Sequence, residues 1–323
     1  MALQINLKRV LITGANGFVG KALCEHLRAA GWDVVAAVRN PNSESEIKVE
    51  SIGRDTPWGH ALKHVSCVIH LAARVHVMSE TVADPLVEFR AINVDGTLNL
   101  ASQAVQAGVK RFIFLSTVKV LGESTQPSRS FQASDMPNPE DAYGISKWAA
   151  EQGLHRLAAQ TAMEMVIVRS PLVYGPGVKA NFASLVRWLR LGIPLPLGAV
   201  TQNRRSLVAL DNLVDLLATC IDHPAAANQT FMVSDGEDLS TADLLHRLGQ
   251  AMGQPARLIA VPSRLLLTGA CMLGKRDLAQ RLLGNLQVDI SKTRELLGWA
   301  PPVRVDEGLR RAVPRVKTNE ALF

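Results

Sequence analysis

The sequence predicts an α/β fold, with a doubly wound parallel sheet in the first half and a smaller mixed domain towards the C-terminus. The first half alternates short apolar runs with helical patterns, which implies right-handed crossovers and helices on both faces of the sheet. Residues 67–73, CVIHLAA, indicate a strand buried on both faces. After Pro171 proline and glycine become frequent, which marks a change to loops and short helices. The first half is therefore Rossmann-type with extra strands.

The expected elements follow one another in a regular order. Strands are expected at 9–14, 33–39, 67–73, 111–117 and 164–170, and helices at 20–31, 85–108 and 141–161. Further along, a strand at 204–210, a helix at 211–224, a strand at 229–236 and helical patterns at 241–253 and 291–298 are expected. We predict a first domain of residues 1–172, which 205–235 rejoins, and a second domain of 173–204 and 236–323.

The overall charge argues against nucleic acid as a partner. The formal charge is +6, but the basic residues are scattered and no aromatic residues interleave with them. A mild positive balance fits a small anionic ligand equally well. Histidines form no H-x-x-H or H-E-x-x-H pattern, so no metal is expected, and His70 is expected to pack in the core.

The cysteines and the apolar segments bear on the compartment. Cys24, Cys67, Cys220 and Cys271 form no C-x-x-C pair and each lies in an apolar context, so buried thiols in a reducing, cytoplasmic environment are expected. No secretory signal is visible at the N-terminus. The apolar stretch 265–274 is too short to span a bilayer, which needs about 20 residues. A half-buried helix is expected there, with contact to a membrane surface or a partner as the alternative.

The segment LITGANGFVG at 11–20 predicts a phosphate-binding turn. It places glycines at Gly14, Gly17 and Gly20, between a predicted strand and a predicted helix. Glycines let phosphate oxygens approach backbone N–H groups, and the N-terminus of the following helix favours negative charge. A second strand follows about 20 residues on, as in dinucleotide-binding units.

The end of that second strand bears on the choice of cofactor. An acidic residue there would bond the ribose 2′-hydroxyl, whereas an arginine would pair with a 2′-phosphate. The strand ends in Val38 and Arg39, and Asp33 lies too early to reach the ribose. NADP(H) is therefore favoured and NAD(H) is the alternative; Arg39 could instead stack on the adenine.

Tyr143 and Lys147 form the predicted catalytic pair. The i, i+4 spacing puts both side chains on one face of a helix. A nearby cation lowers the pKa of a phenol from its ordinary value of about 10, so Tyr143 is expected to exchange a proton with a carbonyl or hydroxyl as hydride moves. Thr117 ends a predicted strand at the edge where such sheets bind ligands and is expected to orient the substrate oxygen.

These motifs together resemble the extended short-chain dehydrogenase/reductase family, the nucleotide-sugar epimerases, dehydratases and reductases. The matching pieces are TGANGFVG (13–20), HLAA (70–73), INVDGT (92–97), LST (115–117), YGISK (143–147) and RSPLVYGPG (169–177). The resemblance implies a UDP- or dTDP-sugar substrate under a closing C-terminal domain. It also implies a homodimer through helices near 83–107 and 142–160.

The resemblance also implies two sets of binding residues. With Arg39, those expected at the dinucleotide are Gly14, Asn16, Gly17, Phe18, Val19, Gly20, Leu71, Ala72, Ala73, Asn93, Tyr143, Lys147 and Pro171. Those expected at the nucleotide sugar are Lys119, Lys179, Asn181, Arg205, Arg281 and Asn285, with Arg204 as a rival for Arg205.

One departure from the family pattern bears on the reaction. Where members read V-Y-G after the serine motif, this chain has VKVLGE at 118–123. With GPGVKANF and RRSLVALDNLVDL, this looks most similar to bacterial 4-reductases of UDP-4-keto-6-deoxy-N-acetylhexosamines, which give UDP-QuiNAc or UDP-FucNAc for surface polysaccharide. We therefore expect an NADPH-dependent 4-reductase. The alternatives are a UDP-hexose 4-epimerase and a non-catalytic NADP-binding sensor.

Overall fold

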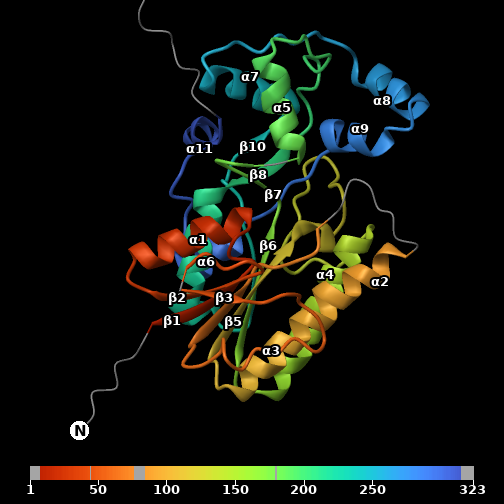
Figure 1. Ribbon diagram of the computed structural model, residues 1–323. Coiled ribbons are helices and arrows are strands. Elements are labelled where there is room, and N and C mark those ends of the chain that lie inside the picture. Colours follow the sequence, from red (N-terminus) through yellow and green to blue (C-terminus); the bar gives the residue numbers. More distant parts are fainter. Residues whose placement is uncertain (1–7, 44, 76–83, 179, 314–323) are drawn as a thin grey trace, which may run out of the picture.

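A seven-stranded parallel sheet forms the centre of the computed structural model, which describes residues 8–43, 45–75, 84–178 and 180–313 (Figure 1). The spatial order is β3-β2-β1-β4-β5-β6-β9: β2 and β3 are added on one side of β1, and β4, β5, β6 and β9 on the other, as in a doubly wound fold. The strands are β1 (Arg9–Thr13), β2 (Asp33–Val38), β3 (Glu46–Lys48), β4 (Cys67–His70), β5 (Arg111–Thr117), β6 (Glu164–Ser170) and β9 (Gln229–Met232). The predicted fold class is confirmed.

Helices cover both faces of this sheet (Figure 1). On one face lie α1 (Phe18–Ala29) and α6 (Leu210–Asp222), and on the other α2 (Pro85–Arg90), α3 (Thr97–Gln106) and α4 (Ala142–Gln160). Successive residues of β1 alternate between the two cores, since Val10 and Ile12 belong to the first and Leu11 to the second. Burial on both faces explains the continuous apolar runs in the sequence.

The helix expected over 85–108 is interrupted by a wider turn. Between α2 and α3 the chain forms a π-helical segment, Ala91–Gly96. Such segments are uncommon and often occur at functional sites. This one carries Asn93 into the interior, where its side chain is 1% exposed.

A second, smaller sheet begins directly after β6. It has the order β10-β8-β7, with β7 (Leu172–Tyr174) parallel to β8 (Arg205–Ala209) and β10 (Asp238–Leu239) antiparallel to β8. Within the segment 205–235, β9 joins the large sheet and α6 packs on α1, whereas β8 lies in the small sheet. The remaining helices are α5 (Ala180–Arg190), α7 (Thr241–Ala251), α8 (Ser263–Met272), α9 (Arg276–Leu283), α10 (Ser291–Leu297) and α11 (Val305–Ala312). Val208 of β8 belongs to the same core as β1 and α6, whereas Leu207 and Ala209 belong to the core of α5 and α7, so β8 packs against both parts of the chain.

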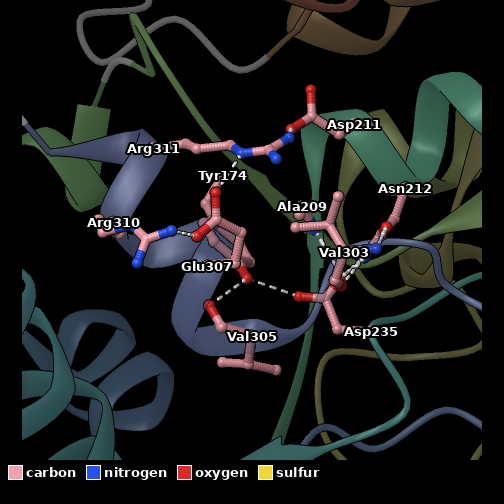
Figure 2. Close-up of polar contacts among 10 residues, drawn as sticks. All are labelled: Tyr174, Ala209, Asp211, Asn212, Asp235, Val303, Val305, Glu307, Arg310 and Arg311. Atoms are coloured by element: carbon pink, nitrogen blue, oxygen red, sulfur yellow. Dashed lines mark hydrogen bonds and ion pairs between the residues drawn. The ribbon is translucent and has the colours of Figure 1, made fainter.

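A buried carboxylate joins the two sheets. Asp235, just after β9, accepts hydrogen bonds from the Tyr174 hydroxyl, the Ala209 amide and the Asn212 side chain, each of 2.7 Å (Figure 2). Asn212 also exchanges two hydrogen bonds of 2.8 Å with the backbone of Val303. Since a buried charge is costly unless it is hydrogen-bonded, this cluster holds β7, β8, α6 and the C-terminal segment in one arrangement.

The cysteines and the longest helices bear on two further expectations. All four cysteines lie among the described residues and are free; Cys24, Cys67 and Cys220 are buried as expected, but Cys271 is exposed. Cys271 is exposed because α8 lies on the surface rather than in a core. In the described part of the chain, no helix combines the length and hydropathy needed to cross a bilayer.

Candidate active site

The glycine turn between β1 and α1 is shaped for an anion. Gly14 has a φ of +68°, and a Cβ added there would lie 2.9 Å from the amide nitrogen of Ala72. Only glycine accommodates both that backbone conformation and that contact. Helix α1 begins at Phe18 after Gly17, which has no side chain to cap the first N–H groups, so these groups can bond phosphate oxygens. Asn16, Val19 and Gly20, also predicted to contact the dinucleotide, belong to the same turn and first helical turn.

The loop after β4 lies against this turn. Leu71, Ala72 and Ala73 are partly exposed there, and the Ala72 amide donates to Thr13 Oγ1 at 3.3 Å. His70, the last residue of β4, lies within 2.7 Å of Thr13 Oγ1 and 2.9 Å of Thr97 Oγ1. Burial lowers the pKa of His70 to about 3, so its ring is neutral and packs in the core, as predicted.

Asn93 connects that loop to helix α4. Its Oδ1 accepts from the Arg74 amide at 2.8 Å, and its Nδ2 donates to the Arg74 carbonyl and to Ser146 Oγ, each at 3.0 Å. Ser146 Oγ in turn donates to the Tyr143 carbonyl at 2.8 Å. The sequence predicts a direct contact of Asn93 with the cofactor; in the structure both ends of its amide bond protein groups. Asn93 therefore acts as a brace between the loop and the helix that carries Tyr143.

The start of α4 is held against the segment that follows β5. Asp141 caps the helix by accepting from the Gly144 amide at 2.6 Å. A Cβ added to Gly144 would lie 2.8 Å from the Lys119 carbonyl, so the helix approaches this segment closely because residue 144 is glycine. Thr117, at the end of β5, accepts from the Lys119 amide at 3.3 Å. The fold thus brings the segments carrying Thr117 and Tyr143 together at the carboxyl edge of the sheet.

Burial dominates the electrostatics of the pair on α4. Lys147 is 2% exposed, its Nζ lies 3.8 Å from the centre of the Phe114 ring, and burial lowers its pKa to about 7. Tyr143 is half-buried, and desolvation, with a smaller effect of the Asp141 carboxylate, raises its pKa to about 12. The prediction that the pKa of Tyr143 lies below its ordinary value is therefore wrong, because burial and the Asp141 carboxylate both raise it. Tyr143 is neutral here, the form that can donate a proton.

The residues around this site match a known family. The model of the NAD dependent epimerase/dehydratase family matches residues 10–234, which contain the glycine turn, Asn93, Thr117, Tyr143 and Lys147. The chain belongs to this family. The family resemblance drawn from the motifs is confirmed, and the protein is an enzyme whose family uses a nicotinamide dinucleotide.

Individual relatives support the same assignment. The chain is 48% identical over 308 residues to a protein of Vibrio cholerae named UDP-glucose 4-epimerase, with 94% of each chain covered. It is 29% identical to a UDP-glucose 4-epimerase of Mycolicibacterium smegmatis, over 94% of this chain and 97% of that one.

Solved structures of similar fold cover almost the whole chain. The UDP-N-acetylglucosamine 4-epimerase from Bacillus cereus superposes with a TM-score of 0.78 at 19% identity, covering 94% of this chain and 96% of that one. MoeE5 in complex with UDP-glucose and NAD superposes with a TM-score of 0.74 at 24% identity, covering 94% and 97%. These likenesses establish the fold alone.

In this member of the epimerase/dehydratase family, a buried ion pair lies one helical turn beyond Lys147. Glu151 is fully buried and accepts from Arg169 Nη2 at 2.7 Å and from Ser116 Oγ at 2.5 Å. Its negative charge opposes the loss of charge on Lys147. Sequence reasoning missed this network; the only signal was an acidic residue four positions after Lys147 on the same helix face.

The residues predicted at the nucleotide sugar are only partly brought together. Arg205 Nη1 donates to the Gly284 carbonyl at 3.2 Å. Burial lowers the pKa of Arg205; the Glu123 carboxylate opposes this shift, and the Arg281 charge adds to it. Asn285 adjoins them, and its Oδ1 accepts from the Arg204 amide at 2.8 Å. Arg205 at the start of β8 and Arg281 on α9 are near enough for their charges to interact, an arrangement that suits a diphosphate.

The other predicted residues are placed as follows. Lys119 is paired with Glu123 and Asp141, each at 2.6 Å, so its charge is balanced by the protein rather than offered freely to a substrate. Arg204 turns to the backbone carbonyls of Thr201 and Asn203. Arg39 is exposed after β2, and Pro171 is buried between β6 and β7. Lys179 and the side chain of Asn181 lie outside the described part.

Proposed function

We propose that the protein interconverts the C4 epimers of a UDP-hexose, either UDP-glucose and UDP-galactose or their N-acetyl forms. The observation that carries the proposal is the chain of contacts from Gly14 to Ala72 and from Arg74 through Asn93 and Ser146 to Tyr143. It couples a phosphate-binding turn to a helix that presents a proton-transfer pair. The 48% identical relative, named UDP-glucose 4-epimerase, supports this reaction over the 4-reduction that the sequence motifs favour.

In this proposal each of the chain's own site residues has a separate role. The nicotinamide dinucleotide, when bound, supplies the hydride acceptor and donor. Tyr143 exchanges the proton of the sugar 4-hydroxyl, Thr117 orients that oxygen, and Lys147 bonds the ribose of the dinucleotide. Arg205 and Arg281 hold the diphosphate. Epimerisation would need no net change of cofactor, because the sugar is neither oxidised nor reduced overall.

The NADPH-dependent 4-reduction of a UDP-4-keto-6-deoxy-N-acetylhexosamine is the second candidate. Arg39 favours it, because β2 ends in Val38 and an exposed arginine rather than in an acidic residue that would bond a ribose 2′-hydroxyl. A non-catalytic NADP sensor is disfavoured, because a sensor has no need of the Thr117, Tyr143 and Lys147 set. We further propose a cytoplasmic location, since nucleotide sugars and free thiols suit a reducing compartment. The homodimer through helices near 83–107 and 142–160 stays a prediction from the family resemblance.

Two assays with the same preparation separate the candidates. In the first, NMR follows UDP-glucose and UDP-N-acetylglucosamine with a catalytic amount of NAD; conversion to the galacto epimers supports the epimerase. In the second, absorbance follows NADPH with a UDP-4-keto-6-deoxy-N-acetylhexosamine; stoichiometric loss of NADPH with no epimerase activity would replace the first proposal by the second. If the protein shows neither activity but still binds NADP tightly, the non-catalytic sensor is the remaining candidate. An Arg39→Ser variant tests the cofactor choice, since it should weaken binding of NADP but not of NAD.

A further inference from the structure

Helix α8 is apolar on a surface that the rest of the described chain leaves open. None of its ten residues is buried, whereas Leu245 and Leu248 of the neighbouring α7 are fully buried. Of the fourteen large hydrophobic side chains exposed in the described part of the chain, six fall between residues 259 and 278. We call these six the α8 patch: Ile259, Leu265, Leu267, Met272, Leu273 and Leu278. Scattered apolar side chains are ordinary, but six within one segment that contains a helix indicate an interaction site.

The segment that carries the α8 patch has a positive net charge. Residues 255–281 contain five basic residues and one acidic residue, a net charge of +4 out of +6 for the whole chain. The basic residues are Arg257, Arg264, Lys275, Arg276 and Arg281. Apolar side chains flanked by lysine and arginine are typical of helices that lie in the plane of a membrane interface.

The place of α8 in the fold fits such a contact. Helices α8 and α9 pack on each other and project at one side of the molecule, beyond α5 (Figure 1). Leu266 is half-buried against the second domain, so α8 lies along the surface with Leu265 and Met272 facing away from Leu266 on the helix. Ten residues make a helix of about 15 Å, which lies on a bilayer rather than crossing it.

We propose that the α8 patch docks on an anionic phospholipid surface. The apolar side chains enter the interface while Arg264, Lys275 and Arg276 contact lipid headgroups, each with a favourable electrostatic contribution. A second copy of the chain is a poorer occupant, because two copies of this positively charged segment repel one another. One short helix also falls far below the roughly 800 Å² per partner of a stable protein interface.

The test is sedimentation of the full-length protein with vesicles. We expect binding to phosphatidylcholine vesicles that contain phosphatidylglycerol, little binding to pure phosphatidylcholine, and release at high salt, because salt screens the charge contribution. The double variant Leu265→Glu/Met272→Glu should lower the bound fraction by at least about tenfold, because each side chain loses its burial in the interface. Lys275→Glu/Arg276→Glu should lower binding to the anionic vesicles alone. Arg281 is left unchanged because it belongs to the proposed diphosphate site.

Met136→Glu is the matched control. Met136 is 88% exposed and lies on a different segment, so the Met136→Glu variant should bind vesicles as the parent does. No vesicle binding by the parent protein, or equal loss in the control, would overturn the proposal. Light scattering tests whether a second copy of the chain covers the α8 patch instead. If the parent binds no lipid and Leu265→Glu/Met272→Glu forms a smaller oligomer than the parent, the patch mediates self-association. UDP-sugar turnover in solution should be unchanged in all of these variants, so failure here is distinguishable from failure of the proposed function.

Discussion

The Asn93 side chain donates a hydrogen bond of 3.0 Å to Ser146 Oγ, a residue 53 positions further along the chain. The same amide bonds the Arg74 backbone on the other side. We expect Asn93→Ala to lower the free energy of unfolding by about 1–3 kcal/mol, since buried partners lose their bonds. It should also weaken dinucleotide binding, measured by calorimetry. Asn99→Ala is the control, because Asn99 bonds Gly53 and Thr56 outside the site and should lose stability only.

The two tyrosines of the chain give a matched pair of variants. Tyr143→Phe should lower turnover by about 10²–10⁴-fold, since it removes the proposed proton-transfer group, with little change in stability. Tyr174→Phe should lower the free energy of unfolding by about 1–3 kcal/mol, because buried Asp235 loses a hydrogen bond, and should keep kcat. Steady-state kinetics and urea unfolding measure both. Near-normal turnover of Tyr143→Phe would remove Tyr143 from the mechanism.

The lowered pKa of Lys147 predicts how dinucleotide binding depends on pH. Its pKa is lowered to about 7, so the ammonium is present below that pH and lost above it. Affinity for an anionic dinucleotide should therefore fall as pH rises from about 6 to about 8.5, by up to about tenfold per unit above 7. Lys147→Arg keeps its charge throughout and should flatten the profile. A profile equally steep in Lys147→Arg would assign the titration to another group.

The lowered pKa of His70 predicts how the free energy of unfolding depends on pH. Its folded-state pKa is lowered to about 3 from 6.5, so below pH 6.5 the unfolded chain binds a proton that the folded protein does not. Stability should fall with decreasing pH, by at most about 1.4 kcal/mol per unit. His70→Gln can bond Thr13 and Thr97 without titrating, and its urea midpoint should change less between neutral and acidic pH. An unchanged slope would contradict the assignment.

The proposed contact of Arg205 and Arg281 with the diphosphate predicts that both side chains contribute to the affinity for UDP. Replacing either by Gln should weaken UDP binding by about tenfold to a hundredfold, the usual range for a lost charged hydrogen bond. Arg204→Gln is the control, since its guanidinium bonds the Thr201 and Asn203 carbonyls. Calorimetry with UDP alone avoids any dependence on the sugar. Equal losses in all three variants would indicate a general charge effect rather than a built diphosphate site.

Much of the architecture was accessible from the sequence because local patterns report local geometry. Continuous apolar runs predict strands buried on both faces, and the glycines at 14, 17 and 20 predict the turn before α1. The spacing of Tyr143 and Lys147 predicts their shared helix face. The strand at 204–210 shows the limit of such reasoning, since its pattern is the same whichever sheet it joins; only pairing with β7 and β10 puts it in the small one.

The sequence by itself determined the order of the main strands and helices, the glycine turn before α1, and the shared helix face of Tyr143 and Lys147, the pair proposed for proton transfer. The tertiary structure alone decided that Asn93 braces a loop, that Glu151 and Arg169 form a buried pair beyond Lys147, and that α8 lies exposed. It also decided the pKa of Tyr143, which rises where the sequence predicted a fall. The reason is physical: helix and strand periodicities act over a few residues, whereas desolvation and hydrogen-bond partners depend on which distant segments meet.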